Sequence, residues 1–241
     1  MRAETRHQLK QDRFSKATLS AAEKTFDWSA EHKTRVIGGI VIVLVLAGVG
    51  FGTWSYLTQQ DQKASFALNQ AVRTLDTPLR PAGMPAQPEF PSFASSQERA
   101  TQAHKQFQQI ADEYPHTRSG EIARYFLGVT ASQLGDNASA VRDLQAVADS
   151  RNHEIGALAK LALASVYRDQ GKNKDAIALY QGLIAKPAPT VSKAMAEMEL
   201  AGTYESMGQP VDAKNLYQQI QKEDPTSQAA QLAAQKLKDL K

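Results

Sequence analysis

The 241-residue sequence contains no cysteine. Without cysteine the chain can form no disulfide bond, no thiol nucleophile and no zinc site with thiolate ligands. Other motifs of catalysis and nucleotide binding are missing too: the sequence has no HExxH, P-loop, dinucleotide-binding glycine motif or GxSxG. Its five histidines, at positions 7, 32, 104, 116 and 153, stand in no metal-ligand spacing. We therefore predict that the protein is not an enzyme and has no catalytic, cofactor-binding or metal-binding residues.

An excess of charge is also missing from most of the chain. Residues 1–35 carry eight Lys and Arg against five Asp and Glu, which accounts for the whole net charge of +3. The remaining residues hold twenty charges of each sign. A neutral domain of this kind offers no basic face for a phosphate backbone, so we predict no nucleic-acid partner.

The sequence does contain one long apolar run, residues 36–57, which read VIGGIVIVLVLAGVGFGTWSYL and include no charge. At about 1.5 Å per residue, a helix of this length spans roughly 33 Å, enough to cross a hydrocarbon core of about 30 Å. Trp54 and Tyr56 stand at its end, where aromatic rings favour the lipid–water interface. We predict a single transmembrane helix over residues 36–57.

Two alternatives to a membrane anchor are open. A buried helix of a soluble core would normally show a polar face, and this run has none. A removable signal peptide could be cleaved after Ala47 in Val45-x-Ala47. However, a preceding segment of 35 residues is too long for a signal peptide, and apolar residues continue past Ala47. An uncleaved anchor fits the sequence best.

Basic residues around the anchor predict its orientation. The fifteen residues before it include Lys24, Lys33 and Arg35, whereas the fifteen after it include only Lys63. The positive-inside bias places residues 1–35 in the cytoplasm, as an arm, and the chain from residue 58 onward across the membrane.

Within the anchor, Gly48 and Gly52 form a GxxxG pair. Such a pair lets two membrane helices approach closely, so we also predict a homo-oligomer through these glycines.

The composition changes twice after the anchor. Residues 58–76 lack Gly and Pro and place their apolar residues on one helical face, which predicts an outward helix that can serve as the first helix of a degenerate repeat. Residues 77–95 hold five of the ten prolines and predict an extended loop. Ser95 and Glu98 then predict a capping box at the start of the next helix.

Beyond this loop three features recur at steps of 36 and 37 residues. They are an alanine followed by large apolar residues two and four positions later, a glycine, and a second alanine followed by apolar residues four and seven positions later. The first alanines are Ala123, Ala159 and Ala196; the glycines are Gly135, Gly171 and Gly208; the second alanines are Ala140, Ala176 and Ala213. Small residues let paired helices cross closely, and glycine suits a tight turn. Each unit therefore predicts a helix, a glycine turn and a second helix.

This pattern resembles the tetratricopeptide repeat. The matching residues are the pairs Leu127–Gly128, Leu163–Ala164 and Leu200–Ala201, the tyrosines Tyr167 and Tyr204, and the prolines Pro115 and Pro225. The resemblance implies an all-α fold, in which a transmembrane helix precedes a solenoid of helical hairpins. We expect repeats over residues 96–225 and a C-terminal capping helix over residues 226–241.

The first helices of tetratricopeptide arrays line a concave groove. By position, the resemblance implies that the groove residues here are Ile122, Tyr125, Val129, Leu158, Leu161, Arg168, Met195, Met198 and Glu205. An apolar groove that contains methionine suits a peptide or a partly unfolded chain. It is equally open that neighbouring helices pack these side chains away.

The order of arm, anchor, outward helix and repeats is similar to that of the YfgM family, ancillary subunits of the bacterial Sec translocon. This resemblance implies a single-pass inner-membrane protein with periplasmic repeats, whose partners would be the translocon, periplasmic chaperones or exported proteins. The predicted function is therefore protein–protein interaction, as a translocon-associated, chaperone-like factor. The alternative is a structural scaffold for cell-envelope assembly or division complexes.

Overall fold

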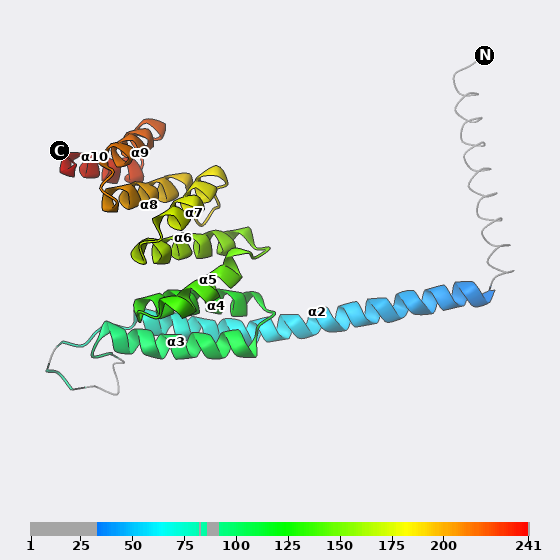
Figure 1. Cartoon of the computed structure of the whole chain (residues 1–241). Helices are drawn as coiled ribbons and strands as arrows, with labels where there is room; N and C mark the ends of the chain where they lie inside the picture. The colour runs from blue at the N-terminus through cyan, green and yellow to red at the C-terminus, as the bar shows by residue number, and fades with distance from the viewer. Residues whose placement is uncertain (1–32, 82, 86–91, 241) are drawn as a thin grey trace, which may run out of the picture. The chain divides into compact units, whose positions relative to one another are not determined.

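The structure is a computed structural model that describes residues 33–81, 83–85 and 92–240 (Figure 1). Over these ranges it contains nine α-helices and no β-strand, only two isolated bridges. The chain divides near Thr58 into two units, and each is considered by itself. The predicted all-α class is confirmed. Most of the predicted arm, residues 1–32, lies outside the described residues.

The first of these helices, α2 (Lys33–Asp76), contains the whole apolar run. By length and composition it could cross a membrane, and the apolar side chains at positions 37–57 are exposed. This exposure argues against a buried core helix. Because residues 58–76 contain no Gly or Pro, nothing breaks the helix before Asp76.

The part of α2 that belongs to the second unit packs on its neighbours through one face. Ala64, Leu68 and Ala71 are buried on this face, and Leu68 and Ala71 pack against Phe107 and other apolar residues of the next two helices. Two polar contacts fix the register: Thr74 Oγ1 donates to Gln106 Oε1 at 2.8 Å, and the amide of Ser119 donates to Asp61 Oδ1 at 3.0 Å. This end of α2 is therefore part of the helical stack.

The remaining helices each pack on the next in chain order (Figure 1). They are α3 (Ser96–Glu113), α4 (Arg118–Gln133), α5 (Asn137–Ala148), α6 (His153–Asp169), α7 (Asn173–Ala185), α8 (Lys193–Ser206), α9 (Pro210–Glu223) and α10 (Gln228–Asp239). As the sequence predicts, Ser95 caps α3: its side chain accepts a hydrogen bond from the amide of Glu98, and the Glu98 carboxylate accepts one from the amide of Ala94.

Glycines make the turn inside each hairpin. Gly135, Gly171 and Gly208 have φ of +82°, +73° and +69°, a left-handed conformation that disfavours residues with a Cβ. At Gly171 the glycine amide donates to the carbonyl of Arg168, and the amide of Lys172 donates to the carbonyl of Tyr167. Equivalent bonds at the other two turns satisfy the last carbonyls of α4 and α8. The predicted hairpin turns are confirmed.

Repeated small and large residues build the core between paired helices. The alanines of both recurring patterns are fully buried in all three units. The apolar residue four positions after the second alanine fills the adjoining space, as Leu144, Tyr180 and Tyr217. The paired backbones can approach closely because each crossing has small alanines, with a large apolar residue that fills the space beside them.

Candidate partner-binding groove

The first helices of two neighbouring units, α4 and α6, border a hollow with a volume of about 370 Å³. Tyr125 and Val129 line it from α4, and Leu158, Leu161 and Arg168 line it from α6. On each helix these residues are three or four positions apart, or multiples of that spacing, and therefore share a face. The structure thus brings together five of the nine residues predicted to form a groove.

A second hollow, with a volume of about 200 Å³, adjoins the first because Tyr125 and Leu158 line both. Ile122 lines it from α4, which brings the number of predicted residues at these hollows to six. We call the surface formed by Ile122, Tyr125, Val129, Leu158, Leu161 and Arg168 the α4–α6 groove.

The apolar side chains of the α4–α6 groove are half-buried, and they also pack against the core. The ring of Tyr125 meets that of Phe126 edge-on at 5.1 Å, and Phe126 stacks on Phe107 at 5.0 Å. Burial also raises the pKa of Tyr125. These residues are therefore both groove wall and core, so neither of the two alternatives from the sequence describes them fully.

One end of the α4–α6 groove is charged. Arg168 Nη1 donates to Glu199 Oε2 of α8 at 2.8 Å, and Arg168 Nη2 donates to Ser165 Oγ at 3.0 Å. Tyr180 lies buried within the electrostatic influence of Arg168 and Glu199, and burial raises its pKa to about 12. A partner segment at this end would meet a paired charge whose geometry is already fixed.

The other three predicted residues lie on α8 and are not among the residues that line these two hollows. Met195 is 44% exposed. Met198 packs in a cluster with Leu237 and Leu240, at the C-terminal end of the chain. Glu205 pairs with Lys236 of α10 at 3.8 Å. Near Met198 and Glu205, α10 thus occupies space that the sequence left to the groove.

Phe66 on α2 is a large apolar residue that the predicted groove does not include. Ala64 and Leu68, on either side of it, are buried, whereas Phe66 is 69% exposed. In the repeat pattern it stands where Tyr125 and Leu161 stand. We call these equivalent positions, Phe66, Tyr125, Leu161 and Met198, the stripe. The sequence signal for Phe66 was the same alanine, large apolar residue and leucine pattern.

Thr190 also lines the second hollow, and no pattern in the sequence indicates it. It lies in the loop between α7 and α8, and its hydroxyl donates to the carbonyl of Glu154 at 2.7 Å. Because a loop 36 residues further along the chain makes this contact, periodicity within helices could not reveal it.

Within the described ranges, no cluster of three or more His, Asp or Glu residues could hold a metal ion. Comparison with protein-family models finds a match to a tetratricopeptide repeat-like domain over residues 24–241. Comparison with curated proteins finds no match.

Proposed function

Since the chain belongs to the tetratricopeptide repeat-like domain family, whose model matches most of its length, we propose that it holds a segment of a partner protein in the α4–α6 groove. Domains of this family mediate protein–protein interactions, and the α2 helix provides a candidate anchor at a membrane. The protein would thus present its repeats to partners close to that membrane.

The observation that carries this proposal is the continuity of the two hollows between α4 and α6. They share Tyr125 and Leu158, and apolar side chains dominate their walls. An amphipathic helix or extended segment needs a row of apolar contacts flanked by polar groups. Arg168 and Glu199 supply such polar groups at one end, and Asn152 and Glu154 supply them at the other.

We further propose that the protein sits in a bacterial inner membrane with periplasmic repeats, where it assists exported proteins as a translocon-associated, chaperone-like factor. The excess of Lys and Arg before the anchor supports this orientation. The resemblance in layout to the YfgM family supports the translocon association.

A structural scaffold for envelope assembly or division complexes is the second candidate function. It is favoured by the packing of Met198 against the α10 end of the chain and by the pairing of Glu205 with Lys236. These contacts shorten the open part of the groove, and a fixed partner needs only a short site.

Two leucines on the same helix can test the groove. Leu161 is half-buried and lines the groove, whereas Leu163 is 3% exposed in the core. We expect Leu161→Ser to reduce the recovery of crosslinked partners from membranes, with a smaller loss in melting temperature than Leu163→Ser causes. Leu163→Ser should cost several kcal/mol, as large core truncations do. Recovery per folded molecule should stay unchanged in Leu163→Ser.

Met198→Ser is a further control because Met198 is a stripe residue that packs in the α8–α10 cluster. We expect it to lower the melting temperature and to leave recovery per folded molecule unchanged. If Leu161→Ser also lowers only the melting temperature, the groove proposal is wrong and the scaffold remains.

A further inference from the structure

Each of the three units places the same two positions opposite each other across the helices of its hairpin. The first position holds Arg124, Lys160 and Glu197 on α4, α6 and α8; the second holds Ala146, Gly182 and Gln219 on α5, α7 and α9. Steps of 36 and 37 residues separate the members of each set, as in the rest of the repeat. The space between the two positions can therefore be compared from unit to unit.

In the third unit side chains fill this space. Gln219 Nε2 donates to Glu197 Oε1 at 3.0 Å, and Lys193 Nζ lies 3.5 Å from the same oxygen. Glu223 accepts hydrogen bonds from both Gln219 and Lys193. The Glu197 side chain is only 1% exposed as a result. Here most of the polar atoms pair with one another within the protein, and only Glu197 Oε2 of this cluster is buried without a hydrogen-bond partner.

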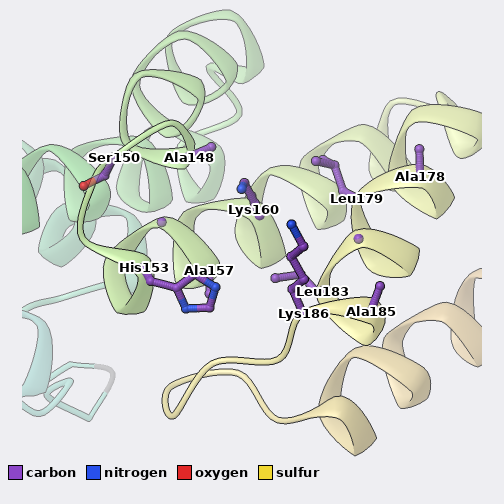
Figure 2. Close-up of a pocket in the computed structure, with 12 residues that line it drawn as sticks. Ala148, Ser150, His153, Ala157, Lys160, Ala178, Leu179, Leu183, Ala185 and Lys186 are labelled. Carbon is purple, nitrogen blue, oxygen red and sulfur yellow. The ribbon is translucent and has the colours of Figure 1, made fainter.

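In the second unit the same space is open (Figure 2). It is a hollow of about 530 Å³ between α6 and α7, lined by Lys160, Lys186 and His153 and by no acidic residue. Figure 2 shows Lys186 extending from the end of α7 towards Lys160 on α6. No ion pair of either lysine is present among the described residues.

Gly182 is the reason for this opening. It stands where the third unit has Gln219, and a Cβ built on it would meet no atom within 4 Å. Glycine inside a helix is destabilising relative to alanine, and no close contact requires it here. The first unit has Ala146 at this position and a smaller hollow of about 310 Å³, whose lining includes the acidic Glu121. The second unit thus has the larger of the two hollows, and no acidic residue in its lining neutralises the lysines.

We propose that the hollow between α6 and α7 binds a carboxylate side chain from an acidic segment of a partner protein. Lys160 and Lys186 supply the positive charge, and Ala157 and Leu183 form an apolar wall for the methylene stem. Lysine ammonium groups act as point charges and can pair with a carboxylate or with a phosphate. The apolar wall matches the methylene stem of an acidic side chain and has no counterpart in inorganic phosphate, so a protein carboxylate is favoured.

This site is separate from the α4–α6 groove. The α6 residues that line the carboxylate site are His153, Gly156, Ala157 and Lys160, and none of them lines the groove hollows. A partner could bind at either surface without the other. The groove variant Leu161→Ser should accordingly leave binding at the carboxylate site unchanged, so the two proposals fail independently.

The test uses the purified full chain in a neutral detergent and a fluorescein-labelled peptide that contains four glutamates spaced by alanine and leucine. The control peptide has glutamine in place of each glutamate. Fluorescence polarisation should show binding of the glutamate peptide that weakens with added salt, and much weaker binding of the control peptide. Lys160→Gln with Lys186→Gln should raise the Kd by about five- to tenfold, as loss of two partly exposed ion pairs would.

Two further variants keep the test specific. Gly182→Gln should fill the hollow, as Gln219 does in the third unit, and should also weaken peptide binding while the protein stays folded by circular dichroism. Lys174→Gln with Lys222→Gln removes the same charge at exposed positions outside the hollow and should change the Kd less than about twofold.

Three results would overturn the proposal. Equal losses in the two lysine pairs would show general charge attraction. Equal binding of both peptides would show an apolar site. Displacement of the glutamate peptide by inorganic phosphate, beyond that by chloride at equal ionic strength, would identify a phosphate site.

Discussion

Leu144 on α5 lies so close to Gly128 on α4 that a Cβ at position 128 would come within 2.7 Å of the Leu144 Cγ. The equivalent positions in the next two units hold Ala164 and Ala201, and there the residue opposite is Tyr180 or Tyr217. In each unit, the size of the residue on the first helix thus goes with the residue that faces it on the second helix. The first hairpin uses the smallest residue, because a Cβ at position 128 would also lie 3.1 Å from the backbone nitrogen of Leu144.

We expect Gly128→Ala to destabilise the protein by about 1–3 kcal/mol, because the added methyl group overpacks the crossing of α4 and α5. The matched control is Gly202→Ala in α8, where a Cβ would meet no atom within 4 Å. That change should stabilise the helix by about 0.5–1 kcal/mol. Thermal unfolding followed by circular dichroism measures both, and a neutral Gly128→Ala would contradict the tight crossing.

The turn glycines give a second prediction. Gly171→Val should destabilise by about 1 kcal/mol or more, because a β-branched residue is poorly tolerated at the φ of +73° found there. Gly171→Asn should cost less, since asparagine tolerates the left-handed region. Urea unfolding of the two variants compares them directly. If valine and asparagine cost the same, the turn does not depend on this conformation.

The hairpins could be predicted from the sequence because the residues that define them are local and recur. A glycine in each turn and an alanine at each crossing mark every unit, whatever its neighbours do. Gly128 shows the limit of this reasoning. The sequence shows that Gly128 matches the repeat pattern, but only the structure shows that Leu144 makes glycine necessary there.

The groove could be predicted only in part. Its members on α4 and α6 lie on the first helices of adjacent repeat units. Their positions in the repeat pattern are therefore enough to identify them. Met198 and Glu205 face α10, whose docking position follows from packing after the last repeat. Thr190 reaches the groove from a loop, which has no periodicity.

Phe66 offers a test of whether the partner surface extends to α2. Because its side chain is 69% exposed, Phe66→Ser should change the melting temperature little. If α2 contributes to the partner surface, crosslinked partner recovery should fall. Leu68→Ser, two residues away and 9% exposed, is the control and should lower the melting temperature instead. Unchanged recovery with Phe66→Ser would confine the surface to α4 and α6.

The buried carboxylate of Glu197 predicts a pH dependence. Burial raises its pKa above the ordinary value of 4.5, so the folded state holds this proton more tightly than the unfolded state. Its contribution to the free energy of unfolding therefore falls as pH rises from about 4.5 through the raised pKa. Glutamine does not ionise, so Glu197→Gln lacks this pH-dependent contribution to the free energy of unfolding. The variant should match the wild type near pH 4 and exceed its melting temperature at pH 7.

Glu223→Gln is the control, because the ionised Glu223 stabilises the fold whereas the ionised Glu197 destabilises it. Hydrogen bonds from Lys193 and Gln219 lower the pKa of Glu223, so its ionised form stabilises the fold above the ordinary value, and this contribution is lost as pH falls. Glu223→Gln should thus be less stable than the wild type at pH 7 and approach it in acid. Melting temperatures across this range that move in the same direction for both variants would refute the assignment.

The absence of cysteine permits a direct test of membrane orientation, since a single introduced cysteine is the only thiol in the chain. Gln231→Cys places a thiol on an exposed position of α10, and Ser15→Cys places one in the arm. The basic residues before the anchor predict that the arm stays in the cytoplasm. A membrane-impermeant maleimide added to spheroplasts should therefore label Gln231→Cys at once and Ser15→Cys only after the membrane is permeabilised. Labelling in the opposite order would reverse the orientation and exclude a periplasmic partner for the repeats.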